Sequence, residues 1–135
     1  MTGVADDSVV VEASGHEVAI SHPDKVFFSE RSDTKLDLVH YYSAVEGPLL
    51  EAMGGRPVLL QRFPNGAEGK SFFQKRVPDK RPEWLETTVV STPNGTTSRA
   101  LVAADLAHIL WAVNMGCLGF LILIAVVTAG PNGED

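Results

Sequence analysis

The alternation of short apolar runs with turn residues predicts a β-hairpin in the middle of the chain. Residues 58–63 are an apolar run after a proline, long enough for a strand and too short for a helix. Pro64-Asn65-Gly66 has turn chemistry, because proline presets φ and Asn-Gly tolerates a positive φ. Residues 71–75 form the second strand. Since adjacent strand residues face opposite ways, we expect one of Phe72 and Phe73 to be exposed and the other to be in the core.

Runs of β-branched residues predict further strands on either side of this hairpin. Residues 87–92 and 96–102 flank Asn94-Gly95, a dipeptide typical of tight hairpin turns. Nearer the N-terminus, residues 17–21 form a plausible strand, and an earlier strand is expected to start near Val9. The remainder of residues 1–15 is expected to be a flexible N-terminal end.

Helical spacing of apolar residues predicts two main helices. Thr34 followed by Asp37 approximates a capping box at the start of the first helix. Gly47-Pro48 ends that helix, and Pro48 can be the first residue of a short second helix through Met53. Residues 103–115 read as the second main helix, with Gly116 as its natural stop. The expected fold class is therefore α/β (α+β), a mixed or antiparallel sheet with two main helices.

A long apolar run near the C-terminus supports two interpretations. Residues 109–129 are long and apolar enough to span a bilayer as a helix, so a non-catalytic, membrane-associated protein with a C-terminal tail anchor is one alternative. Gly116 and Gly119 argue against one continuous helix, and the β-branched block 122–127 suits a buried strand. The favoured interpretation is therefore a helix followed by a strand. A membrane is accordingly not expected among the partners.

Composition places the chain among ordinary globular proteins. It has 135 residues, of which 44% are hydrophobic and 21% charged, enough for one domain with a real core. The single Cys117 excludes an intramolecular disulfide and a cysteine cluster for zinc. The N-terminus is acidic and lacks the apolar core of a signal peptide, so a cytoplasmic location is expected.

Charge sets one segment apart from the rest. Seven of the 11 Lys and Arg residues, but only two acids, lie between Arg56 and Arg81, giving this segment +5 in a chain of −6. Aromatic rings interleaved with cations suit a nucleic acid, because bases stack on rings and phosphates pair with cations. The alternative from composition alone is a half-buried hairpin with a solvated, charged face.

Several motifs in order resemble the polymerase domain of bacterial ligase D. That domain belongs to the archaeo-eukaryotic primase superfamily and serves non-homologous end joining. The resemblance covers residues 18–120, so residues 16–120 are expected to form a partial polymerase-like domain, the N-terminal portion of a primase-polymerase fold. The motifs are His22-Pro23-Asp24-Lys25-Val26-Phe27-Phe28, Thr34-Lys35, Arg62-Phe63-Pro64-Asn65-Gly66, Phe72-Phe73-Gln74-Lys75, Pro82-Glu83-Trp84-Leu85, Ala104-Asp105-Leu106-Ala107-His108 and Trp111-Ala112-Val113-Asn114.

The resemblance implies DNA-end binding and gap-filling nucleotide addition. Its implied partners are DNA ends or gapped DNA with a 5′-phosphate, a ligase module and a Ku-type end-binding protein. Lys25 and Lys35, with His22 nearby, would grip the 5′-phosphate beside a helix N-terminus, where free backbone N–H groups favour anions. Without the resemblance, two solvated lysines would be the default interpretation. The residues implied to contact the DNA template or nucleotide are Arg62, Asn65, Phe72, Phe73 and Lys75.

The sequence departs from the family pattern at its end. Residues 121–135 form a divergent, apolar tail, for which a shifted reading frame is one explanation. The family uses Mn²⁺ or Mg²⁺ held by an Asp-x-Asp pair, which these 135 residues lack, so no catalytic residue, metal ligand or cofactor is assigned. His108 is expected to be structural. Three origins remain open for a chain expected to be truncated and inactive alone: a pseudogene-like fragment, part of a split polymerase, or a binding-only remnant.

Overall fold

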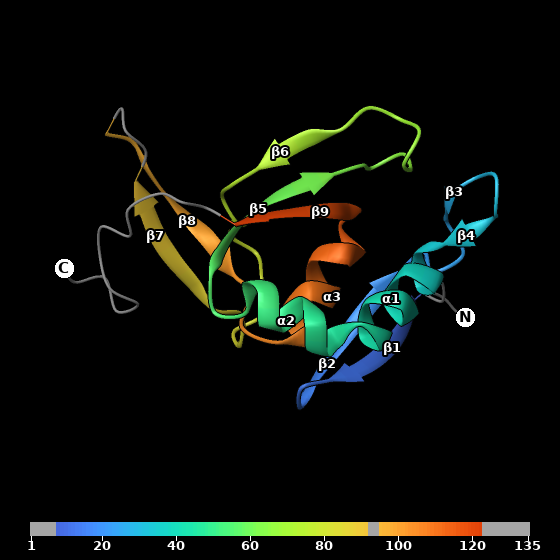
Figure 1. The fold of residues 1–135 in the computed structure, drawn as a ribbon, viewed down its shortest axis with the longest axis horizontal. Coiled ribbons are helices and arrows are strands. Elements are labelled where there is room, and N and C mark those ends of the chain that lie inside the picture. Colours follow the sequence, from blue (N-terminus) through green and yellow to red (C-terminus); the bar gives the residue numbers. More distant parts are fainter. Residues whose placement is uncertain (1–7, 92–94, 123–135) are drawn as a thin grey trace.

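The described part of the chain, residues 8–91 and 95–122, mixes strands with three helices (Figure 1). The structure is a computed structural model. The strands are β1 (Ser8–Ala13), β2 (His16–Ser21), β3 (Val26–Phe28), β4 (Asp33–Thr34), β5 (Pro57–Arg62), β6 (Phe72–Gln74), β7 (Thr87–Ser91), β8 (Thr97–Val102) and β9 (Cys117–Ile122). The helices are α1 (Lys35–Ala44), α2 (Glu46–Met53) and α3 (Leu106–Asn114).

Strand β5 is the centre of the largest sheet, whose pairings are all antiparallel. It pairs with β9 from Val58 to Arg62, while β6 and β8 pair with separate parts of it, around Leu60–Arg62 and Pro57–Val58. Strand β7 pairs with β8. Both predicted hairpins are therefore confirmed, and the fold is the expected mixture of helices with antiparallel sheet. Residues 92–94, where the second turn was predicted, lie outside the described residues.

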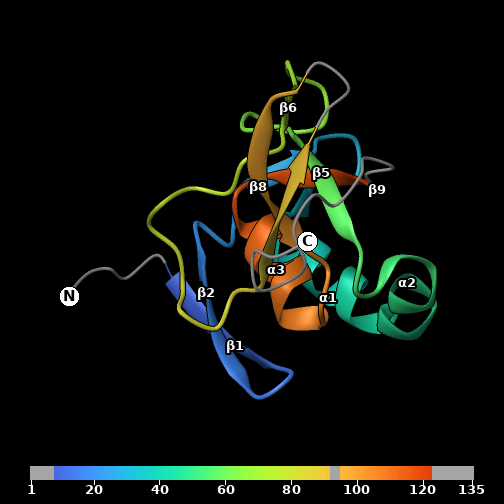
Figure 2. The same ribbon diagram turned by 90° about the vertical axis from the view of Figure 1, so that its left-hand side faces the viewer.

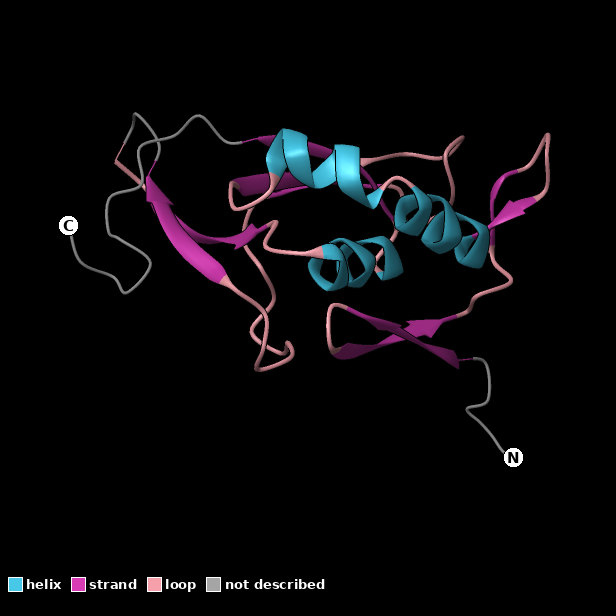
Figure 3. Cartoon of the chain, turned by 60° about the horizontal axis from the view of Figure 1, so that its bottom comes forward, coloured by secondary structure: helices cyan, strands magenta, loops and turns pink. Residues whose placement is uncertain are grey.

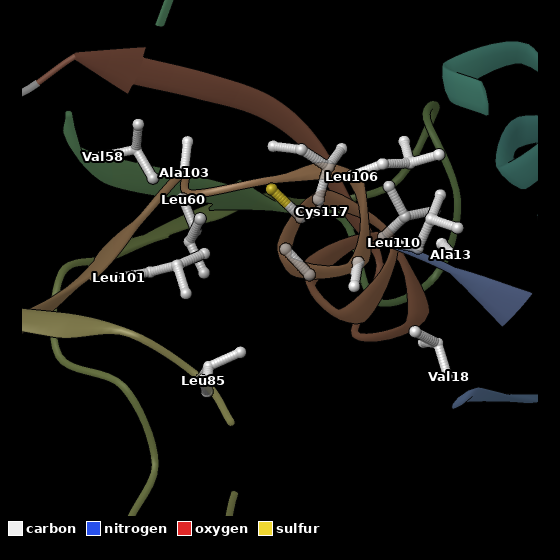
Figure 4. Close-up of a cluster of buried hydrophobic side chains, with 14 of the residues drawn as sticks. Ala13, Val18, Val58, Leu60, Leu85, Leu101, Ala103, Leu106, Leu110 and Cys117 are labelled. Carbon is white, nitrogen blue, oxygen red and sulfur yellow. The ribbon is translucent and has the colours of Figure 1, made fainter. Parts of the chain in front are cut away.

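Helix α3 is the core element that joins the two halves of the fold. It contacts β2 on one side and β9 on the other, so it lies between the larger sheet and the separate β1–β2 pair (Figures 2 and 3). A helix that is apolar on nearly every side must be buried. Its side chains Ile109 and Leu110 are fully buried, and the cluster continues through Leu60, Leu101 and Cys117 (Figure 4).

Local capping signals in the sequence determine where the helices begin and end. The capping box is confirmed: Asp37 N–H donates to Thr34 Oγ1 at 3.2 Å, and Thr34 N–H donates to Asp37 Oδ2 at 2.9 Å. Gly116 stops α3 with a φ of +86°, and an added Cβ would come 3.2 Å from Phe63 O. Phe63 N–H also donates to Gly116 O at 2.8 Å, so the end of α3 is fixed against the end of β5.

The apolar run 109–129 is not one helix. Its described part is divided into the end of α3, a turn at Gly116 and strand β9, because a positive φ interrupts the helical backbone. The spanning-helix interpretation is wrong for this part. Within residues 8–91 and 95–122, every helix is too short or too polar to cross a membrane. Residues 123–129 lie outside the described residues.

Candidate nucleic-acid interface

A tight turn brings Lys25 to the start of α1. Lys25 N–H donates to His22 O at 3.0 Å, and His22 has a left-handed φ of 51°, uncommon for a residue other than glycine. The turn is held against the helix by Leu36 N–H, which donates to Pro23 O at 3.0 Å, and by Lys35 N–H, which donates to Lys25 O at 2.8 Å. Lys25 and Lys35 therefore lie side by side although ten positions separate them in the sequence.

The helix N-terminus itself is not free to bind an anion. Lys35, Leu36 and Asp37 carry the first N–H groups of α1, and all three groups donate to oxygens of the protein. The expectation that free backbone N–H groups point at a ligand here is therefore wrong. The turn before the helix and the capping box take those donors, so any anion site at this place must rely on side chains.

Lys35 is a buried lysine, not a solvated one. Its side chain is 4% exposed, and Nζ donates to Ser21 O at 2.6 Å, Asn114 O at 2.9 Å and Asn114 Oδ1 at 3.3 Å. Burial, and secondarily the charge of Lys25, lowers the pKa of Lys35 from its ordinary value of 10.5 to about 8. The ammonium thus joins the ends of β2 and α3 to the start of α1.

Lys25, in contrast, is exposed and reaches the loop between β5 and β6. Its Nζ donates to Pro64 O and lies 5.6 Å from the centroid of the Phe27 ring. Ala67 N–H donates to Phe27 O at 2.8 Å, so β3 and this loop are held together next to the lysine. Lys25 therefore has a fixed position on the surface, between the turn that carries it and the basic hairpin.

Two cavities meet at this lysine pair, and both are lined by Lys25 and Lys35. The larger, about 710 Å³, also includes His22 and Asp24 in its wall. The smaller, about 170 Å³, includes Arg62. The structure thus brings Arg62 to the lysine pair, an association that could not be predicted from the sequence because these residues lie in separate motifs.

Arg62 is held in one orientation by three neighbours. Its Nε donates to Met115 O at 2.9 Å and its Nη1 to Gln74 Oε1 at 2.7 Å. The guanidinium carbon lies 5.1 Å from the centroid of the Phe72 ring, within cation–π range. The orientation of this cation is therefore set by the end of α3 and by β6.

The aromatic pair on β6 is exposed on both faces of the strand. Phe72 is 45% exposed and Phe73 is 56% exposed. The expectation that one of them belongs to the core is wrong: β6 is a three-residue strand at the edge of the larger sheet, paired with β5, and neither ring is buried. Asn65 is exposed in the turn and Lys75 is half-buried after β6, and neither lines the two cavities.

His108 is a structural residue whose ring nitrogens are both used. Its side chain is 1% exposed, with Nδ1 2.8 Å from Asp105 Oδ1, and Nε2 accepts from Glu86 N–H at 2.9 Å. Because Nε2 accepts, the proton of the neutral ring is on Nδ1 and donates to Asp105. The Trp84 ring packs edge-on at 5.3 Å. This arrangement leaves no nitrogen for a metal.

The carboxylates of the described residues do not fit a two-metal site. Within residues 8–91 and 95–122, no group of three or more His, Cys, Asp or Glu side chains is arranged to hold a metal ion. Asp33 and Asp37 lie at the start of α1, where Asp33 pairs with Arg31 at 3.2 Å and Asp37 caps the helix. Both carboxylates are therefore already engaged within the protein.

Known proteins resemble this chain over most of its length. The family model described as LigD, primase-polymerase domain, matches residues 34–132. The match includes most of the tail 121–135, so a family boundary at residue 120 stays a prediction.

Two curated relatives are end-joining LigD proteins. The "Multifunctional non-homologous end joining protein LigD" of Mycolicibacterium smegmatis is 32% identical over 63% of this chain and 11% of its own length. The "Bifunctional non-homologous end joining protein LigD" of Bacillus subtilis is 33% identical over 82% of this chain and 17% of its own length. The chain thus spans less than a fifth of either protein.

A solved structure, the polymerase domain from Mycobacterium tuberculosis ligase D in complex with DNA, matches the fold. It has a TM-score of 0.75 and 27% identity, covering 87% of this chain and 41% of that one. Together, the order of the motifs, the matching fold and the family match over residues 34–132 lead to one conclusion: this chain belongs to the LigD primase-polymerase domain family.

Proposed function

We propose that this chain binds DNA ends that carry a 5′-phosphate, as part of the gap-filling step of non-homologous end joining. The observation that carries the proposal is the convergence of Lys25 and Lys35 at two cavities, in a chain whose net charge is −6. Two like charges held together are unfavourable unless an anion compensates them. The related polymerase domain solved with DNA supports nucleic acid as the source of that anion.

The three residues of the proposed phosphate grip have different roles. Lys25 and His22 are exposed and would contact the terminal phosphate directly in the larger cavity. Lys35 would act mainly through its charge, since protein oxygens already occupy its donors. Asp24, also in the wall of this cavity, opposes an anion, so the site depends on the two lysines together.

The first test of this assignment is the Lys25→Ala variant. We expect it to bind gapped DNA with a 5′-phosphate and gapped DNA with a 5′-hydroxyl equally, because the exposed ammonium that distinguishes them is gone. A charge-assisted contact of this kind contributes about 1.5–3 kcal/mol, less at high salt. Fluorescence anisotropy titrations of both DNAs give the affinities. A variant that still prefers the phosphate by the wild-type factor contradicts the role of Lys25.

We further propose that Phe72 and Phe73 stack on DNA bases at the gap, with Asn65 and Lys75 beside them. Phe72→Ala and Phe73→Ala should each leave the free energy of unfolding within about 0.5 kcal/mol of wild type, because both rings are exposed. At least one should weaken DNA binding by about 1–3 kcal/mol, the contribution of one stacked base. Urea unfolding and DNA titration separate the two effects. The stacking role is rejected if both variants bind DNA as wild type does.

A further part of the proposal is that the 135-residue chain adds no nucleotides by itself. The reason lies in its sequence, which has no Asp-x-Asp pair to hold the two metal ions of nucleotidyl transfer. Incubation with Mn²⁺, a nucleotide mixture and gapped DNA should leave the primer length unchanged. Template-dependent extension above a protein-free blank contradicts this expectation. A ligase module and a Ku-type protein are the proposed partners that would complete end joining.

A further inference from the structure

We infer that the smaller cavity is a second anion site, which holds the phosphodiester that follows the 5′-terminal nucleotide. The inference rests on the proposed function, since it places a second phosphate of the same strand beside the terminal one. Lys25 and Lys35 line both cavities, so two successive phosphates can use one pair of charges. The two sites together would bind the phosphorylated end of a strand in preference to an isolated anion.

The wall of the smaller cavity favours an anion more than that of the larger one. Its charged residues are Lys25, Lys35 and Arg62, and no carboxylate lines it, whereas Asp24 lines the larger cavity. Its volume of about 170 Å³ is enough for one phosphate group. Three cations around so small a space create a strong local positive potential.

Arg62 offers a donor at this cavity that the protein does not use. Met115 O and Gln74 Oε1 take its Nε and Nη1, and among the described residues Nη2 has no hydrogen-bond partner. The two bonds that are made fix the plane of the guanidinium. An arginine oriented in this way suits a phosphate oxygen, because little side-chain entropy remains to be lost on binding.

Asn114 offers a second unused donor, and its amide orientation is determined. Asn114 Oδ1 accepts from Ser21 N–H at 2.8 Å, and a backbone N–H requires an acceptor, so this atom must be the oxygen. Ser21 Oγ and Lys35 Nζ also lie near Oδ1, at 3.2 and 3.3 Å. Nδ2 is left without a partner in the described structure, and the residue lines the cavity.

The substitution Asn114→Asp tests the inference with little risk to the fold. The carboxylate keeps the acceptor for Ser21 and adds an ion pair with Lys35, while its second oxygen replaces the donor Nδ2. The melting temperature should therefore not fall. Affinity for gapped DNA with a 5′-phosphate should fall roughly tenfold or more, because a neutral donor is replaced by a carboxylate that repels the phosphate. Lys80→Ala, which makes the same change in net charge in an exposed loop outside both cavities, is the control.

A DNA with one neutral linkage identifies the phosphate concerned. The linkage after the 5′-terminal nucleotide is made a methylphosphonate, which removes its charge. Wild type should bind this DNA roughly tenfold less tightly, and Asn114→Asp should show no such loss, because its contact is already absent. A separate measurement uses Arg62→Gln. This variant should reduce the magnitude of the negative slope of log affinity against log salt by about 0.7–0.9, the value for one lost phosphate contact.

Two results overturn the inference. One is an equal loss from the methylphosphonate in wild type and Asn114→Asp. The other is a methylphosphonate without effect, combined with inorganic triphosphate that competes with DNA for wild type but not for Asn114→Asp. That combination would indicate a nucleotide site. Failure of the proposed function has a separate signature, since wild type would then not distinguish a 5′-phosphate from a 5′-hydroxyl.

Discussion

Replacing His108 with alanine is expected to cost the domain about 3 kcal/mol or more of its free energy of unfolding. The ring is buried, and its removal leaves a cavity beside Trp84. It also leaves Glu86 N–H without its acceptor and Asp105 without the donor that it faces. A loss of this size is a large part of the 5–15 kcal/mol, roughly, that stabilises a typical domain.

Urea unfolding followed by circular dichroism measures the effect, with two variants for comparison. His40 is exposed on α1, so His40→Ala should change the free energy of unfolding by less than about 0.5 kcal/mol. His108→Phe restores most of the volume without the hydrogen bonds, so it should recover only part of the loss. If His108→Ala is as stable as His40→Ala, the two-sided hydrogen bonding of this ring is wrong.

Replacing Lys35 with methionine should destabilise the fold by about 2 kcal/mol at pH 7. Methionine keeps the apolar stem but removes the ammonium that joins β2, α1 and α3. Ser21 O and Asn114 O then lose a donor inside the protein, whereas Asn114 Oδ1 keeps Ser21 as a partner. The loss is smaller than the sum of three bonds, because the cost of burying the charge disappears with it.

The difference in the free energy of unfolding between wild type and Lys35→Met should depend on pH, and this dependence is a more specific prediction than the size of the difference. The pKa of Lys35 is lowered to about 8 in the folded protein, whereas the unfolded chain keeps the ordinary value near 10.5. Between these values the unfolded state binds more protons, so the stability of the wild type rises with pH relative to Lys35→Met. The difference between the two proteins should therefore grow from pH 8 to pH 10. A constant or shrinking difference shows that folding does not lower the pKa of Lys35.

Much of the fold follows from local signals in the sequence. The capping box at Thr34, the stop at Gly116 and both hairpins were predicted because each depends on a few neighbouring residues. The start of helix α2 was predicted less accurately. The helix begins at Glu46, two residues before the predicted Pro48, because Val45 is both the C-cap of α1 and the N-cap of α2. The first strand begins at Ser8, next to Val9, where the sequence predicted its start.

The candidate site depended on contacts that no local pattern contains. The burial of Lys35 requires Asn114, which lies 79 positions away, and the position of Arg62 requires Met115, which lies 53 positions away. The motifs identified these residues individually, but spacing along a chain does not show which loops meet. Strand alternation likewise predicted opposite faces for Phe72 and Phe73, but it does not show whether anything covers either face.

The most direct test of the proposed function is the affinity of the unaltered chain for two gapped DNAs that differ only at the 5′ end of the gap. Circular dichroism first establishes that the protein is folded. With a 5′-phosphate the dissociation constant should be roughly tenfold lower than with a 5′-hydroxyl at low salt, and the ratio should shrink as salt is raised. Equal affinity for the two DNAs at every salt concentration contradicts a phosphate grip at Lys25 and Lys35, and would leave the basic hairpin as a generic charged surface.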